Sequence, residues 1–76
     1  MKTIHKARYQ SLLKLLTDAR KEAGLTQSEL SAKLMRPQSY VSKVENAERR
    51  LDVIEFLELC EALGRAPNTL IEQIQL

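Results

Sequence analysis

The chain has 76 residues, of which 43% are hydrophobic and 29% are charged; this length supports a single domain, expected over residues 1–76, and the composition excludes a disordered or membrane-spanning chain. The net charge of +2 divides unevenly, because residues 1–50 hold eleven basic and five acidic residues whereas residues 51–76 hold one and five. The basic part suits a polyanion such as DNA, although chance or solubility would also explain the asymmetry.

The sequence contains no strand signal, so the pattern predicts an all-α protein. The first helix is expected over 7–23, where apolar residues recur at helical spacing, and Gly24 follows where a left-handed C-cap needs glycine. These apolar residues are Tyr9, Leu12, Leu13, Leu16, Ala19 and Ala23. The second helix is expected over 26–34, because Thr26 and Glu29 have the spacing of a capping box.

The third helix is expected over 38–46, after Arg36-Pro37, because the residue before a proline is pushed out of the α region. Val41 and Val44 are the apolar residues expected to anchor this helix in the core. The two valines leave the polar side chains of the helix on its outer face.

The fourth helix is expected to begin after Asp52, which forms a second capping box with Glu55, and to end at Gly64. Its inward stripe is expected to contain Ile54, Leu57, Cys60 and Leu63. The last helix is expected over 67–76, because Pro67 is tolerated in a first turn. Its apolar stripe contains Leu70, Ile71, Ile74 and Leu76.

Two short helices with a turn of about four residues between them have the geometry of a helix-turn-helix. The runs LTQSELSAKL at 25–34 and QSYVSKVEN at 38–46, continued by ERRLD at 48–52, resemble the Cro/C1-type (XRE) repressor family over about residues 8–66. The resemblance implies a five-helix, lambda-repressor-like domain whose second and third helices form the helix-turn-helix. It also implies a transcriptional regulator, of repressor or controller type, that binds double-stranded DNA sequence-specifically.

The resemblance assigns expected roles to individual residues. Gln27, at the start of the second helix, is expected to contact a phosphate with its amide and the helix-end N–H groups. The third helix enters the major groove in such proteins, and the side chains expected to contact bases there are Gln38, Ser39, Ser42 and Lys43. The other side chains expected to contact phosphates are Arg36, Tyr40, Asn46, Arg49 and Arg50.

Some of these residues have alternative interpretations. Tyr40 is as well suited to packing in the domain, and Arg49 and Arg50 are also typical of a solvated turn. Two further positions concern the fold alone: Arg20 and Glu45 match an internal ion pair of similar repressors, which predicts the same pair here.

Met35 and Ala47 stand where the family usually has turn glycines. A left-handed conformation costs a residue with a Cβ about 1–2 kcal/mol. We therefore expect these two turns to be built differently from those of the family.

One reading helix covers too few base pairs to select a site, so we expect a homodimer on a palindromic operator with half-sites about 34 Å apart. The fourth and fifth helices carry more apolar residues than a core-facing stripe needs, and these additional residues are the candidate interface. Its residues are Phe56, Leu59, Leu70, Ile71 and Ile74. The alternative is that the fifth helix packs back onto the fourth and covers this surface.

The main alternative function is that of an antitoxin or adaptor, which would use the same domain to bind a protein partner. An enzyme is a poor fit, because the sequence has no Gly-rich phosphate loop and no Cys–His dyad. Cys60 and His5 are the lone residues of their types, so we expect a core cysteine, a solvated histidine and no metal, cofactor or small-molecule ligand. The polar N-terminus does not resemble a signal peptide, and we expect a cytoplasmic protein that contacts no membrane.

Overall fold

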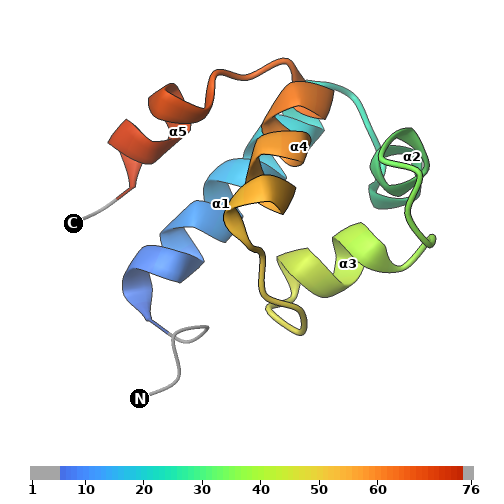
Figure 1. Ribbon diagram of the computed structural model, residues 1–76, viewed down its shortest axis with the longest axis horizontal. Helices are drawn as coiled ribbons and strands as arrows, with labels where there is room; N and C mark the ends of the chain where they lie inside the picture. Colours follow the sequence, from blue (N-terminus) through green and yellow to red (C-terminus); the bar gives the residue numbers. More distant parts are fainter. Residues whose placement is uncertain (1–5, 75–76) are drawn as a thin grey trace.

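The computed structural model describes residues 6–74, and within this range the chain forms five helices and no strand. The helices are α1 (Ala7–Glu22), α2 (Gln27–Lys33), α3 (Tyr40–Glu45), α4 (Val53–Leu63) and α5 (Pro67–Gln73). α1 and α4 lie in the middle of the molecule, with α2 and α3 on one side and α5 on the other (Figure 1). The prediction of an all-α, five-helix domain is confirmed, whereas the expectations for His5 and Leu76 fall outside the described residues.

Both predicted capping boxes are present. Thr26 Oγ1 accepts a hydrogen bond from the backbone N–H of Glu29 at 3.0 Å, and Glu29 Oε1 accepts one from the N–H of Thr26 at 2.8 Å. Asp52 and Glu55 exchange the same two bonds at 2.8 and 3.0 Å. Because a capping box satisfies N–H groups that have no partner in the helix, α2 and α4 begin where the sequence predicts.

Left-handed residues end four of the helices. They are Gly24 (φ 75°), Met35 (φ 58°), Ala47 (φ 61°) and Gly64 (φ 68°). After Met35, the N–H of Arg36 donates to the carbonyl of Ser31 at 2.9 Å, which is the long bond of a Schellman motif. The expectation that Met35 and Ala47 would impose different turns is therefore wrong, because both adopt the glycine-type conformation in spite of its cost.

The core lies where α1, α3, α4 and α5 meet, and Leu30 of α2 belongs to it. Its buried apolar residues are Leu13, Leu16, Ala19, Leu30, Tyr40, Val41, Val44, Phe56, Leu59, Cys60, Leu63 and Leu70. The predictions that Val41 and Val44 face inward and that Cys60 is a core residue are confirmed. Burial raises the pKa of the Cys60 thiol, and among residues 6–74 no group of three or more His, Cys, Asp and Glu side chains is placed to hold a metal ion.

The predicted inward stripe of α4 is wrong in part. Ile54 and Leu57 are 63% and 41% exposed. Phe56 and Leu59, expected to be surplus, are buried together with Cys60 and Leu63. The stripe 56/59/60/63 also has helical spacing, so periodicity alone did not distinguish it from the stripe that contains Ile54 and Leu57.

α5 packs back onto the rest of the domain, where it contacts α1 and α4. Leu70 anchors it and is 1% exposed. Three residues of the predicted dimer interface, Phe56, Leu59 and Leu70, therefore belong to the core, and this part of the prediction is wrong. Ile71 remains exposed and Ile74 is half-buried. None of the helices described is long and apolar enough to cross a membrane.

Candidate nucleic-acid interface

A buried hydrogen bond joins α2 to the start of α3. Ser31 on α2 is 0% exposed, and its Oγ accepts a hydrogen bond from the backbone N–H of Val41 at 3.1 Å. This N–H lies in the first turn of α3 and has no partner within the helix. Ser39, the N-cap residue, makes no side-chain capping bond. The start of α3 is therefore capped by α2, a role that the sequence did not reveal for Ser31.

α3 begins two residues later than predicted, at Tyr40. The N–H of Tyr40 donates to the carbonyl of Pro37 at 2.9 Å, so Pro37 opens a tight turn rather than the helix itself. Gln38 and Ser39 lie in this turn and are exposed. Because Ser39 already has dihedral angles close to helical ones (φ −85°, ψ 0°), both side chains still stand at the N-terminal end of α3.

A polar hollow lies between the first residues of α2 and those of α3. Its lining residues are Gln27, Ser28, Gln38, Ser39 and Ser42. Gln38 Nε2 donates to Ser28 Oγ at 3.3 Å, and Asn46 Nδ2 donates to Ser42 Oγ at 3.4 Å. The structure thus gathers three of the four residues expected to contact bases. Lys43, the fourth, is exposed beside the neighbouring hollow formed with Arg36 and Arg49.

The predicted ion pair between Arg20 and Glu45 is confirmed. Arg20 Nε lies 2.8 Å from Glu45 Oε2, and the two side chains are only 10% and 9% exposed. Glu45 Oε1 also accepts a hydrogen bond from Gln27 Nε2 at 2.8 Å. This bond uses one of the two amide hydrogens of Gln27. It therefore ties the first residue of α2 to α3.

Tyr40 is buried between two arginines. Tyr40 is only 6% exposed. The guanidinium carbons of Arg36 and Arg49 each lie 5.0 Å from the centroid of its ring. Such an arrangement is a cation–π contact. Burial raises the pKa of Tyr40. The packing role that the sequence left open for Tyr40 is present.

Carboxylates of α4 hold the same two arginines. Arg49 Nη2 lies 2.6 Å from Glu55 Oε2, and Arg36 Nη2 lies 2.9 Å from Glu58 Oε1. The hydrogen bond from Arg49, together with the capping bond from the N–H of Asp52, lowers the pKa of Glu55 to about 2. Arg49 is therefore not a solvated turn residue. The sequence did not predict these pairs, because they join residues of different elements and the family resemblance did not include them.

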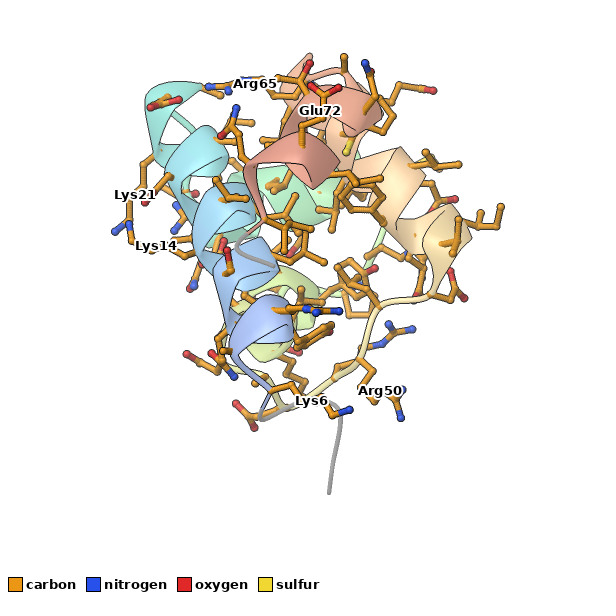
Figure 2. The ribbon with its side chains drawn as sticks, turned by 90° about the vertical axis from the view of Figure 1, so that its left-hand side faces the viewer. Lys6, Lys14, Lys21, Arg50, Arg65 and Glu72 are labelled. Atoms are coloured by element: carbon orange, nitrogen blue, oxygen red, sulfur yellow. The ribbon has the colours of Figure 1, made fainter. Side chains whose placement is uncertain are left out.

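Arg50 is exposed and lies, like Lys6, at the bottom of Figure 2, the end of the molecule towards which α3 lies in both views (Figures 1 and 2). Arg65 and Glu72 lie at the opposite end (Figure 2). Lys6 had not been singled out as a candidate, since its distance in sequence from α3 offers no signal. The end that carries α3 thus bears basic side chains from the residue before α1, Lys6, and from the segment after α3, Arg50.

The family model named Helix-turn-helix matches residues 16–70. A solved structure, an XRE-family like protein from Pseudomonas syringae pv. tomato DC3000, is 63% identical, with a TM-score of 0.83 over 92% of this chain and 88% of that one. The chain belongs to the XRE-type helix-turn-helix family. Its α2 and α3 are therefore the helix-turn-helix of an XRE-type protein, as the resemblance implied.

Two other proteins resemble this XRE-type chain. An uncharacterized HTH-type transcriptional regulator, y4dJ, of Sinorhizobium fredii (strain NGR234) is 44% identical over 45 residues. The match covers 59% of this chain and 58% of that regulator, which is less than two thirds of its length. The hypothetical transcription factor NHTF from Neisseria is 24% identical, with a TM-score of 0.77 over 93% of this chain and 80% of that one, and shows the same fold. The fold and the helix-turn-helix of this chain are thus those of the XRE-type family.

Proposed function

We propose that this XRE-type regulator binds a palindromic operator as a homodimer and reads each half-site with α3 in the major groove. The observation that carries the proposal is the division of α3 and its preceding turn into two faces. Val41 and Val44 are buried, whereas Gln38, Ser39 and Lys43 are exposed. A helix held by one apolar face presents its other face to a groove.

The proposed contacts with base edges come from this outer face. The amide of Gln38 can make two hydrogen bonds with adenine, and Lys43 can donate to the acceptors of guanine. The hydroxyls of Ser39 and Ser42 suit several bases, because a hydroxyl both donates and accepts. Each good contact of the two-bond kind discriminates against the wrong base by about 1–3 kcal/mol.

The proposed phosphate contacts surround α3. Gln27 stands at the N-terminus of α2, and Asn46 and Arg50 are exposed at the C-terminal end of α3 and in the turn after it. Arg36 and Arg49 line the hollow beside Lys43, so their guanidinium groups lie close to the reading residues. Tyr40 takes part in phosphate contact mainly by supporting these two arginines, since little of its own surface is exposed.

The proposed dimer interface is the exposed apolar surface of α4 and α5. Val53, Ile54, Leu57 and Ile71 are 71%, 63%, 41% and 54% exposed. Val53, Ile71 and the half-buried Ile74 line one hollow together with the buried Phe56. Apolar side chains that remain exposed together mark association sites, and a second copy would supply the second reading helix that a palindrome needs.

Selection from a pool of random duplexes, followed by fluorescence-anisotropy titration at two salt concentrations, tests operator binding. We expect enrichment of a palindrome and affinity that falls steeply with salt, because phosphate contacts release counterions. Lys43→Gln should weaken binding and relax the preference at one base pair, whereas Lys14→Gln on α1, with the same charge change, should leave the preference unaltered. Salt-sensitive binding without an enriched site would favour the adaptor or antitoxin alternative, and no binding would refute the proposal.

Analytical ultracentrifugation tests the homodimer. Ile71→Glu places a charge in the proposed interface and should yield monomers at concentrations where the wild type is dimeric. Met35→Glu is the matched control, because Met35 is also exposed (92%) but lies in the turn between α2 and α3. A wild type that stays monomeric with and without operator DNA would refute the dimer.

A further inference from the structure

Arg36 is engaged by two carboxylates and one aromatic ring. Its Nη2 donates to Glu58 Oε1 at 2.9 Å, and its Nη1 lies 3.6 Å from Glu55 Oε2. The guanidinium carbon stands 5.0 Å from the centroid of the Tyr40 ring. A residue that the sequence assigns to DNA phosphate is therefore bound to acidic side chains of α4 in this structure.

The two carboxylates differ in how readily they release an arginine. The side chain of Glu55 is 11% exposed and is also bound to Arg49 and to the backbone of Asp52. The side chain of Glu58 is 48% exposed. Water can replace Arg36 at an exposed carboxylate at little cost, since surface ion pairs contribute little to stability. The bond between Arg36 and Glu58 is therefore the exchangeable one.

Arg36 also lies at the edge of the surface that reads DNA under the proposed function. It lines one hollow together with Pro37, Ser39, Tyr40, Lys43 and Arg49. Carboxylate and phosphate bind the same N–H groups of a guanidinium with similar geometry. Glu58 therefore occupies a donor that a phosphate beside α3 could otherwise use.

We propose that Glu58 is an internal competitor of DNA phosphate for Arg36, and that binding to DNA exchanges one for the other. This inference rests on the proposed function. Glu58 lowers the affinity for every duplex, because its bond to Arg36 must be broken and its negative charge then stands near phosphates. It reads no sequence, since a phosphate contact is the same at every base pair.

The test compares Glu58→Gln with Glu61→Gln. Both residues are exposed on α4, and both substitutions remove one negative charge, but Glu58 is the one bonded to Arg36. Anisotropy titration against a mixed-sequence duplex at low salt should show about two- to fivefold tighter binding for Glu58→Gln. Glu61→Gln should give less than half of this gain. Thermal unfolding of both variants should stay close to that of the wild type, since neither side chain is buried.

A double-mutant cycle assigns the effect to Arg36. In a protein that already carries Arg36→Gln, the substitution Glu58→Gln should tighten binding no more than Glu61→Gln does, because the competition has been removed and only the repulsion between the carboxylate and the phosphates remains. An equal gain from Glu61→Gln, an undiminished gain from Glu58→Gln in the protein without Arg36, or weaker binding by Glu58→Gln would overturn the inference while leaving the proposed function intact. A wild type that binds no duplex would instead refute the proposed function, and the inference with it.

Discussion

The hydroxyl of Ser31 accepts a hydrogen bond from the backbone N–H of Val41 at 3.1 Å, and Ser31 has no exposed surface. Ser31→Ala leaves this N–H without its partner in the interior, which should lower the free energy of unfolding by about 1–3 kcal/mol. Urea denaturation followed by circular dichroism measures the loss. Ser28→Ala, on the exposed face of α2, is the control and should stay within about 0.5 kcal/mol of the wild type. Equal losses in both variants would contradict the capping role.

The ion pair between Arg20 and Glu45 should contribute to stability mainly by avoiding an unpaired buried charge. Glu45→Ala leaves the guanidinium of Arg20 uncompensated and should cost about 3–5 kcal/mol. The double variant Arg20→Met/Glu45→Leu removes both charges and should be more stable than Glu45→Ala alone, as urea denaturation of the three proteins would show. A double variant as unstable as the single one would mean that packing, rather than charge, explains the loss.

Replacing Met35 by glycine should make the left-handed turn at this position more stable. Met35 is 92% exposed with φ 58°, so Met35→Gly removes about 1–2 kcal/mol of backbone strain and loses about 0.4–1 kcal/mol through the more flexible unfolded chain. We expect a net gain of about 0.5–1 kcal/mol in the free energy of unfolding, seen as a higher Tm.

Gly24→Ala is the reverse control. Gly24 has φ 75°, and a Cβ built there meets nothing within 4 Å, so the substitution tests the backbone alone and should lower Tm. A lower Tm for Met35→Gly would show that the methionine side chain makes a stabilising contact.

Lowering the pH should reduce the free energy of unfolding, partly because Glu55 becomes protonated. Its pKa is lowered from 4.5 to about 2 in the folded protein, so its stabilising effect is complete above the unfolded value and is lost as the pH falls from 4.5 towards 2. Glu55→Gln keeps a side-chain acceptor for the capping box but should be less stable at neutral pH and lose less stability in this window. Urea midpoints across the window measure both effects. Glu61→Gln, exposed on the same helix, should retain the acid-dependent loss, and a Glu55→Gln profile that parallels the wild type would contradict the role of Glu55.

Local signals in the sequence predicted the helices well. The starts of α2 and α4 were predicted because the partners of each capping box, such as Thr26 and Glu29, are three residues apart. The start of α3 was placed two residues early, because Pro37 is compatible both with the first turn of a helix and with the tight turn that it forms.

The face of α4 was harder to predict than its ends. Apolar residues lie on two stripes of this helix, one with Ile54 and Leu57 and one with Phe56 and Leu59, and both have helical spacing. α1 and α5 cover the second stripe. Phe56 and Leu59 on this stripe, and Leu70 on α5, are therefore core residues and not interface residues. The exposed stripe, with Val53 and Ile71, is now the proposed interface.

The sequence by itself determined the approximate positions of the helices, the capping boxes of α2 and α4 and, through resemblance to a family, the helix-turn-helix and the pair of Arg20 and Glu45. Only the tertiary structure decided which stripe of α4 is buried, that Ser31 caps α3, and that Glu58 holds Arg36. The physical reason is the range of the interactions. A cap or an amphipathic pattern depends on residues only a few positions apart, so the sequence alone reveals it. A contact between α2 and α3, or between Arg36 and α4, depends on how the helices pack.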